Sequence, residues 1–155
     1  MKKSIILLGF IFGGLIISKS SKAQSNWEAG IRFGDVTSLD ITIPFRAPRI
    51  HAAAYFNNNA FGVGGYFNWM FALNDGPEGL NFYPGVGPEF YFGDNFNVAV
   101  AGDFGAEYSF DFPLTVGVDW RPRIGFTNNT GFYAGNWGLI ARFRFGEGVS
   151  FKRVN

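Results

Sequence analysis

Strict alternation of apolar and polar residues is the feature that most limits what this chain can fold into. In residues 113–122, PLTVGVDWRP, four apolar side chains alternate with Thr115, Gly117, Asp119 and Arg121. Side chains at every second position share one face of a β-strand, whereas the same spacing scatters them around a helix. The stretch therefore predicts a strand with one apolar face and one face that carries charge.

The same alternation recurs after residue 26 and indicates eight strands. We expect them at about 27–34, 38–45, 49–56, 60–73, 81–92, 97–110, 113–122 and 136–145. None of these segments has a charged residue on its apolar face. Turn-forming segments separate them, and the longest expected loop covers about 122–135. Short connections favour antiparallel neighbours, so we predict an all-β, eight-stranded antiparallel up-and-down β-barrel.

The N-terminus has the layout of a secretory signal peptide. Lys2 and Lys3 precede 13 apolar residues from Ile5 to Ile17, and Ser21-Lys22-Ala23 resembles a cleavage site. A membrane-spanning helix is the competing interpretation, but it needs roughly 20 apolar residues. We therefore predict a cleaved signal peptide over 1–23 and a barrel over 24–145. Residues 146–155 form either a C-terminal tail or an extension of the last strand.

The composition excludes several classes of function. Four of the 13 basic residues leave with the signal peptide, so nine remain against 12 acidic residues and the mature net charge is −3. We therefore expect no nucleic-acid partner. The chain has no Cys, which excludes disulfides, thiolate catalysis, Cys-based zinc sites and a lipoprotein anchor.

Three features indicate that the apolar face lies outside, in a membrane. An eight-stranded barrel has a narrow interior, and the bulky Phe and Trp residues lie on the apolar face while the other face is rich in small residues. The charged face has Arg but no Lys, and Arg–carboxylate pairs suit a confined interior. The four Trp residues lie near strand ends, as in interfacial girdles. A soluble lipocalin-like barrel would have the opposite orientation.

The transmembrane interpretation assigns two sets of residues. The first set points into the lumen and forms a charge network: Glu28, Arg32, Asp40, Glu89, Asp103, Glu107, Asp119, Arg121, Arg142 and Arg144. Buried charges must be paired, and we expect Asp119 and Arg121 to pair with residues such as Arg142, Arg144 or Glu107. The second set forms the girdles, with Trp27 and Trp69 toward one rim and Trp120 and Trp137 toward the other.

Several stretches resemble the small OmpA/OmpX-type outer-membrane β-barrel proteins of Gram-negative bacteria. They are the signal-peptide ending SKAQ, the first strand GIRFGD, the segment FDFPLTVGVDWRP and the closing WGLIARFRF. The resemblance covers most of residues 27–145 as a pattern. It implies an outer-membrane location and insertion by the barrel-assembly machinery, which reads an aromatic-rich last strand such as ARFRF at 141–145. This chain departs from the pattern because it continues through GEGVSFKRVN.

The sequence offers little catalytic chemistry. His51 is the only His, and we expect it to be a hydrogen-bonded lumen or rim residue because no Ser–His–acid order is legible. Asp103 and Glu107 lie about 13 Å apart along one strand, too far to share a reaction centre. We therefore expect no catalytic residues, no cofactor and no metal site.

The leading hypothesis is a monomeric, non-enzymatic outer-membrane barrel with a structural or surface-interaction role. Its expected partners are outer-membrane lipid and, during insertion, the barrel-assembly machinery. Three alternatives stay open: a lipid A-modifying enzyme of the same fold, a soluble periplasmic lipocalin-like carrier, and a narrow porin-like ion channel.

Overall fold

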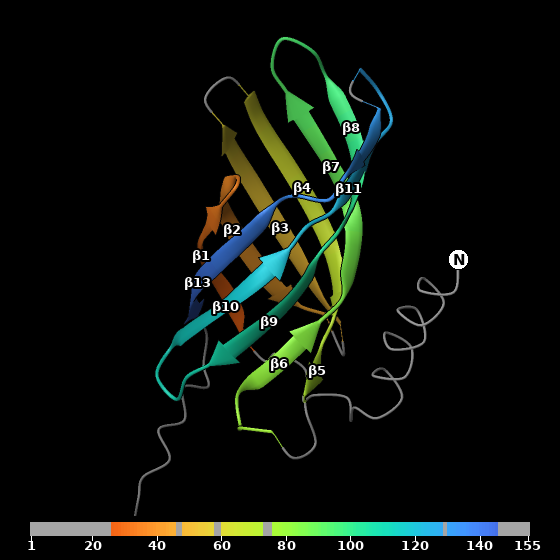
Figure 1. The fold of residues 1–155 in the computed structure, drawn as a ribbon. Helices are drawn as coiled ribbons and strands as arrows, with labels where there is room; N and C mark the ends of the chain where they lie inside the picture. Colours follow the sequence, from red (N-terminus) through yellow and green to blue (C-terminus); the bar gives the residue numbers. More distant parts are fainter. Residues whose placement is uncertain (1–25, 46–47, 58–59, 73–75, 129, 146–155) are drawn as a thin grey trace, which may run out of the picture.

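The chain folds into one curled antiparallel β-sheet (Figure 1). The computed structural model describes residues 26–45, 48–57, 60–72, 76–128 and 130–145. Their strands are β1 (Trp27–Gly34), β2 (Thr37–Pro44), β3 (Pro48–Asn57), β4 (Ala60–Trp69), β5 (Phe71–Ala72), β6 (Leu80–Tyr83), β7 (Gly85–Phe92), β8 (Asn97–Gly102), β9 (Phe104–Ser109), β10 (Leu114–Trp120), β11 (Arg123–Gly125), β12 (Gly131–Tyr133) and β13 (Trp137–Phe145). Within these ranges no helix is long and apolar enough to cross a membrane. The predicted all-β, antiparallel class is confirmed for this part of the chain.

The order of the strands is β12-β11-β8-β7-β4-β3-β2-β1-β13-β10-β9-β6-β5. The first and last long strands lie side by side, because β1 pairs with β13 along its whole length, from Trp27 opposite Phe145 to Gly34 opposite Gly138. On its other edge β1 pairs with β2, which pairs in turn with β3. The N- and C-terminal strands therefore complete each other's backbone hydrogen bonds.

Short interruptions divide several of the expected strands. Met70 separates β4 from β5, Pro84 separates β6 from β7, and Asp103 separates β8 from β9. The interruptions lie on neighbouring strands, and backbone hydrogen bonds cross them: Trp69 N donates to Pro84 O at 2.9 Å, and Asp103 N donates to Gly85 O at 2.8 Å. Pro84 has no backbone N–H to donate to a ladder, which accounts for the break at that residue.

The expected long loop over about 122–135 is wrong. Its two ends are the strands β11 and β12, which pair with each other, and β11 also pairs with β8. The sequence pattern did not indicate β11 and β12, because Pro122 interrupts the alternation and Gly and Asn are frequent in the segment. The break between β12 and β13 contains Asn136, the one described non-Gly residue with a positive φ, 81°.

The two faces of the sheet have opposite chemistry. The outer face is apolar and exposed, with Leu139 at 62% and Trp137 at 60% relative exposure. The inner, concave face is polar, and its largest fully buried side chains are four arginines: Arg32, Arg49, Arg121 and Arg142. The described part of the chain thus has charge inside and hydrocarbon outside, the reverse of a soluble domain.

Two glycines on opposite faces of the sheet provide a test of the packing of the inner face. Gly105 lies on β9, and a Cβ added there would come within 2.4 Å of the buried Tyr83 ring, whereas a Cβ on Gly65 of β4 meets no atom within 4 Å. We expect Gly105→Ala to destabilise the fold by about 1–3 kcal/mol, because overpacking a filled interior causes strain. Gly65→Ala should change stability by at most about 0.5 kcal/mol. Urea unfolding monitored by Trp fluorescence measures both, and equal effects would contradict the packed interior.

Two parts of the predicted domain layout lie outside the described residues. They are the signal peptide over 1–23 and the segment 146–155. Both assignments stay predictions.

Candidate functional site

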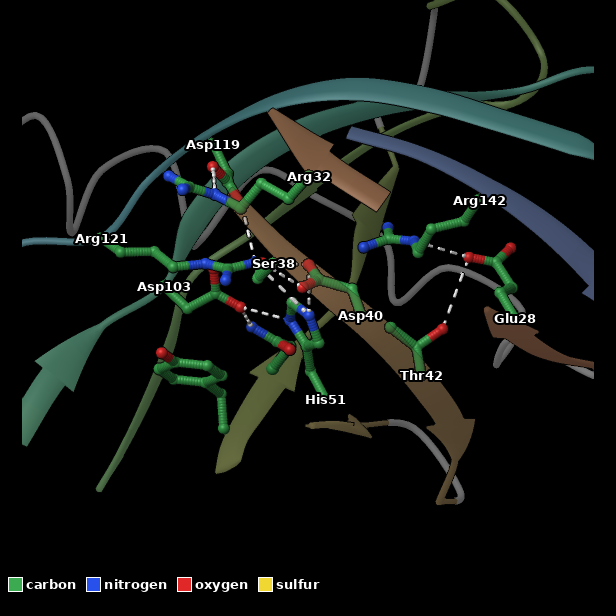
Figure 2. Close-up of polar contacts among 12 residues, drawn as sticks. Glu28, Arg32, Ser38, Asp40, Thr42, His51, Asp103, Asp119, Arg121 and Arg142 are labelled. Carbon is green, nitrogen blue, oxygen red and sulfur yellow. Dashed lines mark hydrogen bonds and ion pairs between the residues drawn. The ribbon is translucent and has the colours of Figure 1, made fainter. Parts of the chain in front are cut away.

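The inner face of the sheet carries a buried ionic network, which is the most distinctive chemical feature of the molecule. Alternation along each strand points its charged residues to this face, and curling of the sheet brings residues distant in sequence together. Figure 2 shows Arg121, Asp103, Asp40 and His51 converging from different strands. The network has three parts.

The first part, the His51 cluster, consists of Arg32, Asp40, His51, Asp103, Asp119 and Arg121. At its centre, Arg121 Nε donates to Asp103 Oδ1 at 3.0 Å and Arg121 Nη2 donates to Asp40 Oδ2 at 2.8 Å. Nη2 also lies 2.8 Å from Asp119 Oδ2. One guanidinium therefore joins three carboxylates, and all four side chains are 0% exposed.

His51 and Arg32 complete the cluster. The His51 ring lies between Asp103 Oδ2, 2.8 Å from Nδ1, and Asp40 Oδ2, 2.9 Å from Nε2. Arg32 Nε donates to Asp119 Oδ1 at 2.7 Å, and its other nitrogens donate to the side-chain and backbone oxygens of Asn136, each at 2.9 Å. Each aspartate of the cluster thus contacts an arginine, and each arginine contacts at least one aspartate.

The second part, the four-charge cluster, consists of Glu28, Arg49, Glu107 and Arg142. Arg49 and Glu107 form a bidentate pair, with Nη1–Oε1 at 2.7 Å and Nη2–Oε2 at 2.9 Å. Arg142 bridges Glu107 and Glu28, and its Nε lies 3.1 Å from Glu28 Oε2. Thr115 donates to the other oxygen of Glu28 at 2.9 Å. Two guanidinium groups therefore balance two carboxylates.

The third part, the tyrosine cluster, consists of Tyr55, Tyr66, Glu89, Tyr91 and Arg123. The hydroxyls of all three tyrosines contact the Glu89 carboxylate, and Tyr91 donates to Oε2 at 2.7 Å. Arg123 lies 4.0 Å from Glu89 and donates to the Tyr91 hydroxyl at 2.6 Å. Arg121 Nη1 donates to Tyr55 at 3.2 Å, which links this cluster to the His51 cluster.

Nine of the ten predicted lumen charges belong to these clusters, and Arg144 does not. Arg144 is half-buried, and its guanidinium donates to the backbone oxygens of Phe110 and Phe112 in the turn between β9 and β10. The expected partners of Asp119 and Arg121 were also wrong. Asp119 pairs with Arg32 and Arg121, while Glu107 and Arg142 pair with each other in the four-charge cluster.

The predicted girdle tryptophans occupy two opposite ends of the sheet. Trp27 stacks on Phe145, with ring centroids 4.5 Å apart, and Trp69 packs edge-on against Phe67. At the other end Trp120 stacks on Trp137 at 5.5 Å, next to the turn between β1 and β2. Trp27, Trp69 and Trp137 are exposed and Trp120 is half-buried.

Sequence reasoning left Arg49 and the tyrosines out of the predicted network. Arg49 begins the expected strand 49–56 and precedes His51 by two residues, so it shares the face of His51 on β3, but it was not included in the predicted charge network. Tyr55, Tyr66 and Tyr91 were placed on the polar face but not in a cluster. Their positions relative to Glu89 depend on the pairing of β3, β4 and β7, which the alternation of a single strand does not contain.

The side chains of the network bond to one another and link strands across the inner face. The Ser38 hydroxyl donates to Asp40 at 2.6 Å instead of to His51, and all three side chains are at most 1% exposed. Among the described residues, no group of three or more His, Asp and Glu side chains is arranged as metal ligands.

Asp35, in the turn between β1 and β2, provides a pH-dependent contact outside the strands. Its carboxylate accepts hydrogen bonds from the backbone N–H groups of Trp137 at 3.0 Å and Asn136 at 2.9 Å, and these bonds lower the pKa of Asp35 below its ordinary value. A lowered pKa means that the contact stabilises the fold at neutral pH. The contribution decreases once the pH falls below the ordinary value of about 3.9, and it is lost as the pH falls through the lowered pKa.

We therefore expect Asp35→Ala to reduce stability at neutral pH and to match the native protein in strong acid. Thermal unfolding across a pH series measures the difference. Asp94→Ala, in the exposed turn between β7 and β8, serves as the control and should show no such trend. A constant difference between Asp35→Ala and the native protein at all pH values would contradict the assignment.

Comparison with protein-family models, with curated proteins and with solved structures finds no match to this chain.

Proposed function

We propose that this chain is an integral outer-membrane β-barrel protein whose lumen is filled by the ionic network. Its role is structural or surface-interacting, and it is not an enzyme. The observation that carries the proposal is the reversed distribution of polarity: four fully buried arginines lie inside a sheet whose outer face exposes Phe, Leu, Ile and Trp. A membrane barrel requires this distribution, because its outer face contacts lipid and its interior is polar.

The pairing of the strands supports a closed barrel of eight strands. β4 and β5, β6 and β7, β8 and β9, β10 and β11, and β12 and β13 are successive pieces of single strands, and β1, β2 and β3 complete the eight. From Gly30 on β1, paired residues lead through β2, β3, β4, β7, β8 and β11 to Gly131 on β12. In the other direction Gly30 pairs with Arg142 on β13. The two paths meet on one strand with an offset along the chain, as a tilted, closed barrel requires.

The filled interior supports a structural role. Eight-stranded barrels are just wide enough for side chains to fill them. Here Arg, Glu, Asp and Tyr side chains bond to one another across the inner face, and nine of the ten predicted lumen charges are at most 3% exposed. A soluble carrier would need an apolar cavity and a polar exterior, which is the opposite arrangement.

The outer surface supports membrane insertion. Exposed aromatic residues lie at both ends of the sheet, with Trp27 and Phe145 at one end and Trp137 at the other. Trp and Tyr favour membrane interfaces because their rings are partly polar. Ile31, Ile41 and Leu139, which are exposed and purely apolar, lie on strands between these ends.

Cell fractionation with gel mobility tests the proposal. The mature protein should remain with outer membranes through an alkaline wash, and a sample left unheated in detergent should migrate differently from a boiled one. An unfolded or soluble protein does not show this difference. Recovery of the folded protein in the periplasm without detergent would contradict the proposal.

A further inference from the structure

The chain's single histidine lies at the centre of its interior. His51, on β3, is 0% exposed, and each of its ring nitrogens faces a different carboxylate. Nδ1 lies 2.8 Å from Asp103 Oδ2 and Nε2 lies 2.9 Å from Asp40 Oδ2. Figure 2 shows the ring between the two acids.

These two contacts determine the protonation of the ring. A carboxylate oxygen only accepts hydrogen bonds, so each ring nitrogen must donate one. A neutral imidazole has one N–H and would place its unprotonated nitrogen against a carboxylate oxygen at hydrogen-bond distance. An imidazolium has two N–H groups and satisfies both contacts.

The one alternative partner for the ring is more distant. Arg121 Nη2 lies 3.4 Å from His51 Nε2, a contact that a neutral ring could accept. The same Nη2 is 2.8 Å from Asp40 Oδ2 and 2.8 Å from Asp119 Oδ2. Nη2 donates a hydrogen bond to Asp40 Oδ2, and His51 Nε2 itself lies closer to Asp40 Oδ2, at 2.9 Å, than to Arg121.

The charge balance of the cluster gives an independent argument. Asp40, Asp103 and Asp119 supply three negative charges, while Arg32 and Arg121 supply two positive charges. The four-charge cluster is already balanced, and Glu89 has Arg123 within 4.0 Å. A protonated His51 makes the His51 cluster neutral, and an unbalanced charge in a dry interior is costly.

The other groups around His51 supply no competing acceptor. The ring is surrounded by side chains from every neighbouring element: Asp40 from β2, Tyr66 and Asn68 from β4, Asp103 between β8 and β9, Glu107 from β9, and Arg121 after β10. Tyr66 bonds to Tyr55 and Glu89, and Glu107 is held by Arg49 and Arg142. In the part of the chain that the structure describes, the acceptors for the two ring nitrogens are Asp40 and Asp103.

We infer that His51 is a buried imidazolium, which locks β2 and the junction of β8 and β9 onto β3 only while it keeps its proton. Loss of the proton leaves a ring nitrogen and a carboxylate oxygen with facing lone pairs. The lock therefore weakens as the pH rises, and the interior has a proton-sensitive centre. The inference does not depend on a membrane location, because the same contacts would form in a soluble barrel.

Nitrogen-15 NMR of the imidazole tests the charge state directly. Because the chain has one His, the ring gives a single, unambiguous set of signals. The folded protein, in whichever detergent or buffer keeps it folded, should show two protonated ring nitrogens at neutral pH. One protonated and one unprotonated nitrogen at that pH would overturn the inference without affecting the proposed membrane location.

A pH series of thermal unfolding tests the lock. The native protein should lose heat resistance as the imidazole signals report loss of the proton, or should unfold at that same pH. His51→Gln, which has an uncharged amide, should be less heat-resistant at neutral pH and should lack this step. Unchanged heat resistance of the native protein after the ring becomes neutral would overturn the lock.

Discussion

Replacing Arg121 with Met should destabilise the fold more than any other single change in the interior. The guanidinium lies within 3.0 Å of Asp40, Asp103 and Asp119, and after the substitution the remaining basic partners of these three carboxylates are Arg32 and His51. Removing one partner from a buried ion pair typically costs about 3–5 kcal/mol, because the remaining charge stays buried. Since folded proteins are stable by about 5–15 kcal/mol, much of the variant should be unfolded in mild urea.

Urea unfolding of the refolded protein, monitored by Trp fluorescence, measures this loss. Arg121→Lys keeps the charge but cannot bond to several carboxylates in one plane. The stability of this variant should therefore lie between those of the native protein and of Arg121→Met. Arg123→Met is the control, because Arg123 is 28% exposed, its partner Glu89 is 4.0 Å away, and Glu89 keeps the hydrogen bonds from the three tyrosines of its cluster. We expect it to cost about 1 kcal/mol or less. Equal losses for Arg121→Met and Arg123→Met would contradict the ionic interior.

An arginine on the outer face should have the second largest effect. Ala141 is exposed at the centre of β13 and lies opposite Ile31 on β1 and Val116 on β10. In a membrane, Ala141→Arg places a charge among lipid chains and should cost about 2–4 kcal/mol. In a soluble protein, the same change at an exposed site is worth at most about 0.5 kcal/mol. The size of the effect therefore distinguishes the two environments.

Two variants control for side-chain size and for depth. Ala141→Leu adds bulk without charge and should insert normally. Phe112→Arg, in the turn between β9 and β10, places the charge near the expected interface and should cost about 0–1 kcal/mol. The measurement is the stability of each variant in lipid bilayers. An Ala141→Arg variant as stable as the Ala141→Leu variant would contradict a lipid-facing β13.

Alternation in the sequence predicted the strands and the chemistry of their faces. Leu114–Trp120 became β10 with Asp119 turned inward, and Trp137–Phe145 became β13 with Arg142 buried. These predictions succeeded because the side-chain period of a strand is a local property. The strands β11 and β12 were missed because Pro122 and several Gly and Asn residues conceal the alternation there.

The partners within the network could not be predicted in the same way. Asp119 pairs with Arg32, 87 positions away, and Arg49 pairs with Glu107, 58 positions away. Such pairs depend on register and on which strands meet, and a shift of one residue changes every partner. The alternation of polar and apolar residues identified most of the buried charged side chains. The position of His51 between Asp40 and Asp103, in contrast, depends on the assembled sheet.

Fluorescence quenching of the tryptophans by brominated lipids tests whether the apolar face of the sheet contacts lipid. The four Trp residues all lie on the outer face of the sheet, and Trp27, Trp69 and Trp137 are exposed there. When the protein is reconstituted into bilayers whose acyl chains carry bromine, we expect strong quenching of its emission and little further quenching by aqueous iodide. If iodide quenched the emission and brominated lipids left it unchanged, the apolar face would not contact lipid. That result would contradict the proposed membrane barrel.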